Sequence, residues 1–423
     1  MELKPGYKQT QVGVIPDDWD ATPISSLLDD NTRITYGVVQ PGKDDPTGVL
    51  FIRGGDVFDG TIDVEGLRRI PVVVSNQYQR TILRGGEILI SLVGFPGESA
   101  LVPSELAGSN IARQVALVRL SKKHGALNEF ICHYLRSPLG KGSLLREAFG
   151  SAQQVINLKD VNKFEMPLPA QSDERIAISA ALSDVDALLA AQDALIGKKR
   201  AIKQGVMQEL LTGKRRLPGF IREWEVKRLG ALGDTYGGLV GKSKAHFGCG
   251  HARYVPFVNV MANVVIDANA FDRVDVGPTE SQNRVMRGDL LLNGSSETAD
   301  EVAMCALVTE DIDDLYLNSF CFGFRIKDVQ TVDGLFFTYY MRGPMGRDLV
   351  RLLAQGSTRY NLSKKALLDG QLRMPEKNEQ VAIANVLSDM DAELTSLQAK
   401  RAKTTLLKQG MMQELLTGTI RLV

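Results

Sequence analysis

The feature that most constrains this chain is a repeat of its own sequence. The segment KQGVMQELLTG at residues 203–213 returns as KQGMMQELLTG at residues 408–418, which is 205 positions later. The only two tryptophans, Trp19 and Trp224, are also 205 positions apart. The chain is therefore a tandem duplication in which each half joins a variable stretch of about 150 residues to a nearly identical tail.

Length and composition limit the class of protein. At 423 residues the chain is too long for one ordinary core, which suggests two or three domains. Its 44% hydrophobic and 24% charged residues are typical of a soluble globular protein. The 50 basic and 50 acidic residues cancel. Net charge therefore neither indicates nor excludes a nucleic-acid partner, because such binding depends on where basic groups cluster.

Cysteine usage and the N-terminus predict the compartment. Cys132, Cys249, Cys305 and Cys321 show no paired spacing, which argues against a disulfide framework and favours a reducing environment. The opening MELKPGYKQTQ lacks the apolar core of a signal peptide. No apolar run approaches the roughly 20 residues of a membrane span. We expect a cytoplasmic protein with no membrane partner.

Each tail is predicted to be one long helix. Residues 172–212 contain no proline, and apolar residues recur at alternating spacings of three and four, which is the pattern of a coiled-coil seam. Each tail follows a proline-containing stretch and ends at Thr-Gly, a glycine C-cap signal. We expect spacer helices within residues 169–215 and 375–423. The expected seam comprises Ile178, Ala181, Val185, Leu188, Leu195, Ile202 and Val206, interrupted by Gln192 and Lys199, and then Ile383, Val386, Met390, Leu394, Leu397, Leu407 and Met411.

Charges along the tails predict how the two helices pair. In both tails acidic residues gather in the first part and basic residues in the last part, as Asp184, Asp193, Lys199 and Lys203 illustrate in the first tail. Laid antiparallel, the acidic end of one helix meets the basic end of the other, so we expect an antiparallel coiled coil. The alternative is that these charges are solvated faces with no meaning for pairing.

The two variable stretches predict a pair of mixed domains. Both contain short β-rich runs broken by Gly, Asn and Asp, which is typical of an α+β domain. We place the first domain at residues 1–168 and the second at residues 216–374. In each, a strand pair is followed by a polar loop, at residues 91–99 and 293–300, and loops that differ on a repeated frame are where recognition normally resides.

Two short motifs suggest ligand chemistry, but neither is complete. In YGGLVGKSK, Gly237 stands one residue too close to Gly-Lys-Ser for a phosphate-binding P-loop, so a flexible basic loop that touches DNA phosphates is the better interpretation. HFGCGH offers His246, Cys249 and His251, three zinc ligands where four are needed. The alternative there is a glycine-rich loop with incidental histidines. The sequence contains no recognisable catalytic constellation, so we expect a chain that is not itself an enzyme and binds no metal or cofactor.

Several stretches resemble the DNA-specificity subunit of type I restriction-modification systems. They are the two repeated tails, LKPGYKQTQVGVIPDDW, GEILISLVGFPGESALVP, GGLVGKSKAHFGCGHARYVPFVNV and GSTRYNLSKKALLDGQLRMP, so the resemblance covers essentially the whole chain. It implies that each variable domain reads one half of a split, asymmetric sequence in double-stranded DNA. It also implies that the helices space the two domains and dock two methyltransferase (modification) subunits. The partners, methyltransferase and motor-nuclease (restriction) subunits, are expected to carry S-adenosylmethionine, ATP and magnesium.

The polar loop residues are the candidates for DNA contact, because Arg and Lys suit guanine or phosphate, whereas Asn and Gln suit adenine. The candidates are Lys43, Arg53, Ser91, Arg113, Gln114 and Gln153 in the first domain, and Lys242, Lys244, Arg253, Ser295, Ser296 and Arg359 in the second. The expected docking residues lie in the repeated helix ends: Gln204, Gln208, Glu209, Leu210, Gln409, Gln413, Glu414 and Leu415. For any one of these the alternative is an ordinary surface residue. For the whole chain the alternative is a coiled-coil protein scaffold, or a decoy paralogue without its own DNA specificity.

Overall fold

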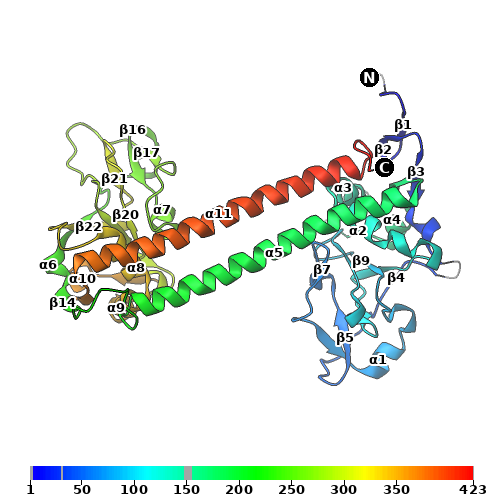
Figure 1. Cartoon of the computed structure of the whole chain (residues 1–423), viewed down its shortest axis with the longest axis horizontal. Helices are drawn as coiled ribbons and strands as arrows, with labels where there is room; N and C mark the ends of the chain where they lie inside the picture. The colour runs from blue at the N-terminus through cyan, green and yellow to red at the C-terminus, as the bar shows by residue number, and fades with distance from the viewer. Residues whose placement is uncertain (1–2, 30–31, 147–154, 423) are drawn as a thin grey trace. The chain divides into compact units, whose positions relative to one another are not determined.

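The structure is a computed structural model, and it describes residues 3–29, 32–146 and 155–422. Contacts between residues divide the chain into two compact units (Figure 1). The first unit contains the chain up to Asp193 together with the segment from Ala399 onward, and the second contains Ala194–Gln398. Each unit is therefore a variable domain with one end of each long helix.

The first unit is built on a four-stranded antiparallel sheet in the order β10-β9-β12-β4. These strands are β4 (Thr35–Tyr36), β9 (Ile88–Ser91), β10 (Ser99–Leu101) and β12 (Val115–Val118). Every residue of β9 and β12 is buried, because the sheet is covered on both faces. Ile88 and Ile90 pack into one core and Leu89 into another, as the alternation of a strand requires.

Different elements cover the two faces of this sheet. On one side lie helices α2 (Asn128–Arg136) and α3 (Pro138–Arg146), which share the core that contains Ile88 and Ile90. On the other side the core includes the three-stranded sheet β11-β5-β8, formed by Asn110–Ile111, Val49–Ile52 and Arg68–Ile70. A further pair joins β3 (Trp19–Pro23) to β13 (Glu165–Pro169), just before the first long helix.

The second unit repeats this frame. Its four-stranded sheet has the order β15-β22-β18-β20, from Gly233–Gly237, Cys321–Ile326, Leu290–Asn293 and Cys305–Leu307. Helices α8 (Gly334–Arg342) and α9 (Pro344–Leu353) take the places of α2 and α3, and strands β17-β16-β21 (Asp272–Val274, Phe247–Val255, Leu315–Leu317) form the second sheet. Strand β14 (Glu225–Arg228) pairs with β25 (Gln371–Met374) before the second long helix. The predicted tandem of mixed α+β domains is confirmed.

The long helices α5 (Ser172–Leu210) and α11 (Lys377–Leu415) contain 39 residues each. Their predicted glycine caps are confirmed, since Gly213 and Gly418 have φ of +70° and +72°, a left-handed conformation that favours glycine. Inside each unit the helices run antiparallel. In the first unit Lys408 pairs with Asp186 and Arg401 with Asp193, and in the second Lys203 pairs with Asp391 and Lys199 with Glu393. The predicted meeting of acidic and basic ends therefore occurs in both units.

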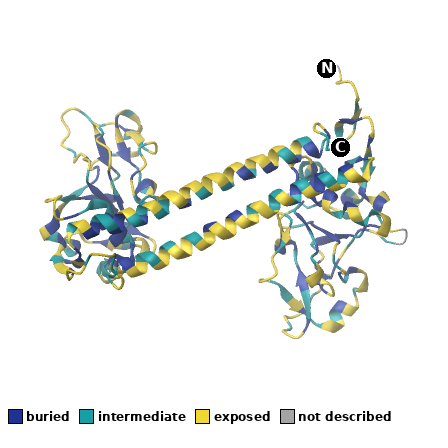
Figure 2. Cartoon of the chain, in the orientation of Figure 1, coloured by how far each residue is buried: buried dark blue, intermediate teal, exposed yellow. Residues whose placement is uncertain are grey.

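The predicted seam is only half right. Leu188, Leu195 and Ile202 are 47%, 41% and 43% exposed, and Leu407 is 58% exposed, so these four side chains lie outside the seam. Figure 2 shows that buried and half-buried residues interrupt the exposed surface of both long helices. The observed seam of α5 instead consists of buried and half-buried residues that recur at alternating spacings of four and three positions. They are Ile178, Leu182, Val185, Leu189, Gln192, Ile196, Lys199, Lys203, Val206 and Leu210. Alternate positions were therefore predicted one residue too early. At three of these positions in α5 the cause is that two apolar residues stand side by side, as in Leu188–Leu189 and Leu195–Ile196, so the apolar pattern does not decide which of them is buried. At the fourth position the half-buried residue is the polar Lys203.

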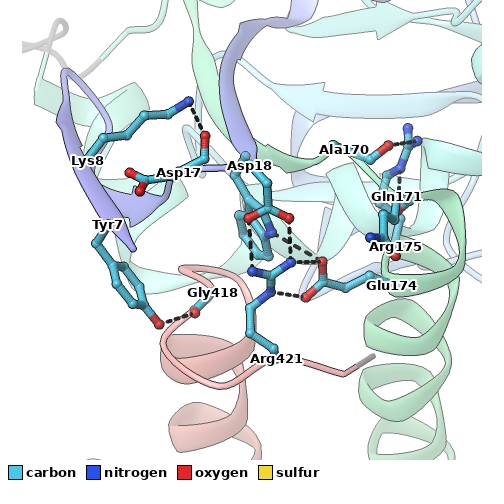
Figure 3. A network of polar contacts seen from close by, with 11 residues as sticks. Tyr7, Lys8, Asp17, Asp18, Ala170, Gln171, Glu174, Arg175, Gly418 and Arg421 are labelled. Carbon is cyan, nitrogen blue, oxygen red and sulfur yellow. Dashed lines mark hydrogen bonds and ion pairs between the residues drawn. The ribbon is translucent and has the colours of Figure 1, made fainter. Parts of the chain in front are cut away.

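Each unit has an ionic cluster just beyond the end of a long helix. Figure 3 shows the cluster of the first unit. Arg421, beyond the end of α11, donates hydrogen bonds to the carboxylates of Glu174 and Asp18, and Trp19 Nε1 donates to Glu174 Oε2 at 3.2 Å. In the second unit Arg216, beyond the end of α5, likewise donates to the carboxylate of Glu379 beside Trp224, but Trp224 Nε1 makes no hydrogen bond among the described residues. Trp19 and Trp224 are 0% and 9% exposed, so both are core residues.

Candidate functional site

In the first unit three chain segments meet at Gly54. A Cβ atom added to Gly54 would lie 2.5 Å from the carbonyl oxygen of Val93, 3.0 Å from Ser91 Oγ and 3.3 Å from Gln114 Cβ. Only glycine permits this approach, because real Cβ atoms do not come so close to backbone. The structure thus brings the predicted residues Arg53, Ser91 and Gln114 together, with Arg113 next to them along the chain.

These residues differ in what they offer to a ligand. Arg113 is exposed and Gln114 is half-buried. Arg53 Nη2 donates to Asp56 Oδ1 at 2.7 Å, and this hydrogen bond raises the pKa of Arg53. The positive charge of Arg53 is therefore already partly neutralised within the domain. Ser91 is 0% exposed, because it ends the central strand β9 and pairs with Val115. The prediction that Ser91 lies in a surface loop and contacts DNA is therefore contradicted.

Two other predicted residues of the first domain lie away from this cluster or outside the described residues. Lys43 is exposed in a loop whose neighbours Gly42 and Asp44 are hydrogen-bonded to Arg68 and Arg69 of β8. Gln153 falls outside the described residues.

In the second unit an exposed arginine lies beside an exposed aromatic ring. Arg359 leads into β24 (Tyr360–Leu362), and its guanidinium carbon is 5.4 Å from the ring centroid of Phe320, which is 57% exposed. Strand β24 pairs with β19 (Ser295–Ser296), so Arg359 lies next to the predicted serines. The pair presents a charged fork and an aromatic edge, both of which suit nucleic-acid surfaces.

Three predicted residues of the second domain are held by the fold. Ser295 and Ser296 are only 7% and 8% exposed, and Ser296 Oγ donates to Glu301 Oε2 at 2.9 Å. The side chain of Lys242 is 3% exposed, and its Nζ donates to the carbonyl of Asp275 and to Glu280, whose pKa this bond lowers to about 2. The expectation that these three reach DNA from surface loops is contradicted, because their polar groups are already paired. Lys244 and Arg253 remain exposed.

Sequence reasoning missed an exposed aromatic pair in the first domain. Phe58 and Phe95 are 57% and 52% exposed, and their rings meet edge to face with centroids 6.0 Å apart. Phe95 lies in the loop between β9 and β10, within the stretch already predicted to be the recognition loop. Its aromatic character was the signal, but only polar loop residues were considered as DNA contacts.

The two incomplete motifs have ordinary structural roles. In YGGLVGKSK, the amide of Gly238 donates to the carbonyl of Cys321 and that of Leu239 to the carbonyl of Leu317. These amides are therefore not available to bind a phosphate. His246 Nδ1 accepts a hydrogen bond from the Ser243 amide at 3.0 Å. Within the described residues, no group of three or more His, Cys, Asp or Glu side chains is placed to hold a metal ion. Among the described helices, none combines the length and apolarity that crossing a membrane requires.

The repeated helix ends present exposed glutamines. Gln204, Gln208, Gln409 and Gln413 are exposed, as is Glu209, whereas Glu414 is half-buried. Leu210 and Leu415 are 4% and 5% exposed and belong to the cores of the second and first unit. The expectation that these two leucines dock a partner is contradicted, because their repetition reflects packing.

A cleft adjoins the first set of glutamines in the second unit. It has a volume of about 670 Å³ and lies among the last turns of α5, the start of α9 and the middle of α11. Gln204 and Gln208 line it, together with the charged residues Arg200, Lys203, Arg351 and Asp391. This groove has the size and mixed polarity of a site that receives part of a protein partner.

Comparison with known proteins gives a consistent family. A family model described as "Type I restriction modification DNA specificity domain" matches residues 44–197 and 222–405. The type I restriction enzyme EcoBI specificity subunit of Escherichia coli is 33% identical over 162 residues, which is 38% of this chain and 34% of that protein. A Methanocaldococcus jannaschii protein provisionally described as the type I restriction enzyme MjaX specificity subunit is 22% identical over 98% of this chain and 96% of its own length.

Two solved structures share the fold. One is a chain in a structure described as the basis of complex assembly and conformational transition of the type I R-M system. It has a TM-score of 0.59 at 16% identity and covers 96% of this chain and 99% of that chain. The other is the type I restriction-modification system S subunit from M. genitalium, with a TM-score of 0.54 at 15% identity and 98% coverage of both chains.

Proposed function

We infer that this chain, which belongs to the type I restriction-modification DNA specificity family, is the subunit that selects the DNA sequence on which its partner enzymes act. The observation that carries this inference is the repetition of one frame with two different surfaces. Both units have the same sheet order, yet the first presents Arg113, Gln114 and the pair Phe58–Phe95, whereas the second presents Arg253 and Arg359 beside Phe320. Two such readers would bind two unlike half-sites of one asymmetric target.

The repeated helix ends support the second part of the proposal, which concerns protein partners. Since the same glutamines occur at residues 204 and 208 and again at 409 and 413, two copies of one partner would dock in equivalent ways. We propose that these are methyltransferase subunits, and that motor-nuclease subunits join them in the full complex. The chain itself would be non-catalytic and act in the cytoplasm, with S-adenosylmethionine, ATP and magnesium bound by the partners.

The experiment that tests this function maps methylation. The chain is co-expressed with its methyltransferase partner in a host that lacks adenine methylation, and methyladenine is located across the genome by single-molecule sequencing. We expect one asymmetric motif in two blocks separated by unread bases. Replacing residues 20–164 by the matching domain of a relative should change one block and leave the other.

The contrary outcome is also clear. If a complex shown to assemble by size-exclusion chromatography adds no methyl groups, the chain is a scaffold or decoy and the proposal is wrong. Salt-dependent, sequence-selective binding to a duplex separates these cases independently, because a protein scaffold would show neither property.

A further inference from the structure

An arginine-lined cavity lies in the first unit, at the end of strand β12 opposite to Gln114. Its volume is about 470 Å³. Arg33, Arg80, Arg84 and Arg119 line it, with the hydroxyl-bearing Thr32 and Thr35. No acidic and no aromatic side chain occurs among its described lining residues. Such a cavity attracts an anion.

Arg119 serves as the support of this cavity. Its guanidinium donates to Glu87 Oε1 at 2.8 Å, and to the carbonyl oxygens of Arg80 and Ile82 at 3.3 Å and 3.0 Å. The buried carboxylate of Glu87 neutralises the charge of Arg119. Arg119 therefore stabilises the segment that carries Arg80 and Arg84. The same segment is fixed by the Leu83 amide, which donates to Ser109 at 2.9 Å.

The other three arginines have their charges available. Arg33, Arg80 and Arg84 are exposed, and among the described residues none of their guanidinium groups makes a hydrogen bond or an ion pair. The three arginines line one cavity, so an anion that enters it meets more than one positive charge. Guanidinium groups bind phosphate and carboxylate oxygens through two parallel N–H donors.

The second unit shows that the frame does not need these charges. It repeats the supporting pair as Arg325 and Asp289, whose atoms Nη2 and Oδ2 are 2.7 Å apart. In the first unit Arg84 and Arg80 stand three and seven residues before Glu87. In the second unit the positions three and seven residues before Asp289 hold Met286 and Gln282. The equivalence is supported by the same hydrogen bond, from the amide of Arg84 to Glu87 and from that of Met286 to Asp289.

The second unit also occupies the corresponding space. Tyr236 pairs with Gly323 across the sheet, as Thr35 pairs with Leu117, and both partners stand two residues before the supporting arginine. The hydroxyl of Tyr236 donates to Asp289 at 2.6 Å, so its ring covers the frame that is open in the first unit. In the described part of the second unit, neither Arg80 nor Arg84 therefore has an arginine counterpart.

We propose that this cavity, which we call the arginine cavity, binds a phosphate of the DNA backbone beside the half-site that the first domain reads. The proposal rests on the proposed function of DNA recognition. The lack of an aromatic lining residue favours a backbone phosphate over a free nucleotide, whose base would have nothing to stack on. Strand β12 separates Gln114 from Arg119 by five residues, about 17 Å at ~3.3 Å per residue. That length equals about five base-pair steps of ~3.4 Å, so one duplex can reach both ends.

The test transplants the residues of the second unit. The double variant Arg80→Gln, Arg84→Met carries what the second unit has at these positions, so the frame is expected to fold. The complex with the methyltransferase partner is titrated with a duplex that contains the mapped motif, over a range of salt concentrations. We expect the slope of log K against log salt to fall by roughly 1, since one lost phosphate contact removes about 0.9. Sequence preference should stay the same, because phosphate contacts carry no sequence information.

The matched control removes two exposed cations of the same domain outside the cavity. The variant Lys122→Gln, Lys123→Gln should keep the wild-type slope, and an equal fall in this control would reduce the effect to general surface charge and overturn the proposal. An unchanged slope in Arg80→Gln, Arg84→Met, while the wild type still binds its motif, would also overturn it and leave the proposed function intact.

A second probe separates the source of the phosphate. Binding of pyrophosphate and of ATP to the full chain is measured by calorimetry for the wild type and for Arg80→Gln, Arg84→Met. Weak pyrophosphate binding that the variant loses, without tighter ATP binding, supports a backbone site. Tight, arginine-dependent ATP binding with an unchanged DNA slope would identify a nucleotide site and refute the backbone assignment. If the wild type binds no duplex selectively, it is the proposed function that fails.

Discussion

His133 lies in α2 of the first unit, enclosed between that helix and the start of α5. Its Nε2 is 3.0 Å from Ser183 Oγ, and its Nδ1 is buried without a hydrogen-bond partner. Burial, together with the nearby charges of Arg136 and Lys408, lowers the pKa of His133 to about 4, against the opposing effect of Asp186. The folded state therefore favours the neutral imidazole.

This environment predicts a loss of stability in mild acid. The folded-state pKa lies below the ordinary value of 6.5, so the contribution is complete above pH 6.5 and is lost as the pH falls toward 4. Between pH 8 and pH 5 the free energy of unfolding of the first unit should fall by about 2 kcal/mol. The variant His133→Gln should remove this dependence.

The measurement is urea unfolding followed by tryptophan fluorescence in a Trp224→Phe background, so that Trp19 reports the first unit. The pH range stops at 5 so that Asp186 stays ionised throughout. Burial raises the pKa of Asp186, but its bonds with Lys408 and Arg136 lower this pKa by more, so the carboxylate titrates only below that range. An unchanged pH dependence in His133→Gln would show that another group is responsible.

At the scale of the elements, two polar residues inside the helix seam form a hydrogen bond with each other. Gln192 and Thr404 are 7% and 8% exposed, and Gln192 Nε2 donates to Thr404 Oγ1 at 3.1 Å. Thr404 in turn donates to the carbonyl of Lys400 at 3.1 Å. Gln192 Oε1 has no partner among the described residues, so the pair is only partly satisfied.

The pair predicts non-additive substitutions. Thr404→Val alone leaves the buried amide of Gln192 without its acceptor and should lower the free energy of unfolding by about 1–3 kcal/mol. The double variant Gln192→Leu, Thr404→Val should be neutral or more stable, because it removes every unmatched group at once. Urea titrations of both single variants and the double variant form a double-mutant cycle. Additive effects would mean that the two side chains do not interact.

The repeated glutamines predict which substitutions release each copy of the partner. Gln204→Glu with Gln208→Glu should release one methyltransferase copy from the proposed complex, and Gln409→Glu with Gln413→Glu should release the other. A partner surface that matches an amide must desolvate each new carboxylate, which costs several kcal/mol. Native mass spectrometry counts the bound copies.

The control for this experiment adds two carboxylates elsewhere on α5. Ala180 and Ala187 are exposed and lie outside the repeated motif, so Ala180→Glu with Ala187→Glu should leave both copies bound. Full occupancy in both glutamine variants would place the docking surface elsewhere.

At the scale of the whole molecule, each unit contains part of the long helix that belongs to the other half of the repeat. The core of the first unit contains Met412, Leu415 and Leu416 of α11, and the core of the second contains Leu210 and Leu211 from the end of α5. Each variable domain is therefore completed by the tail of the other half of the sequence.

This organisation predicts that a C-terminal truncation damages the N-terminal domain. A chain that stops at Gln398 loses three core side chains of the first unit, each worth about 1.5–3 kcal/mol on burial. That total is comparable to the whole stability of a typical domain. Hydrogen exchange should show loss of protection in α2, while α8 of the second unit remains protected.

A shorter truncation is the matched control. A chain that stops after Gly418 keeps the three core side chains but lacks Arg421, which leaves the fully buried carboxylate of Glu174 without its ion-pair partner. It should be destabilised by about 3–5 kcal/mol without complete loss of α2 protection. Equal protection of α2 and α8 in the Gln398 truncation would contradict the division into units.

The sequence by itself determined the duplication, the two α+β domains, the long helices with their glycine caps and the antiparallel charge pattern. These features come from local chemistry: helix periodicity, left-handed glycines and opposite charges along one axis.

Only the tertiary structure decided which polar side chains are available. Ser91, Ser295, Ser296 and Lys242 read as surface contacts in the sequence, yet strand pairing and nearby carboxylates enclose them. The helix seam likewise includes polar side chains because partners on the opposite helix satisfy them. The arginine cavity could not be predicted, since Arg33, Arg80 and Arg119 are brought together only by the folding of distant segments. Burial, and the pairing of polar groups that burial requires, depend on contacts between residues far apart in the chain.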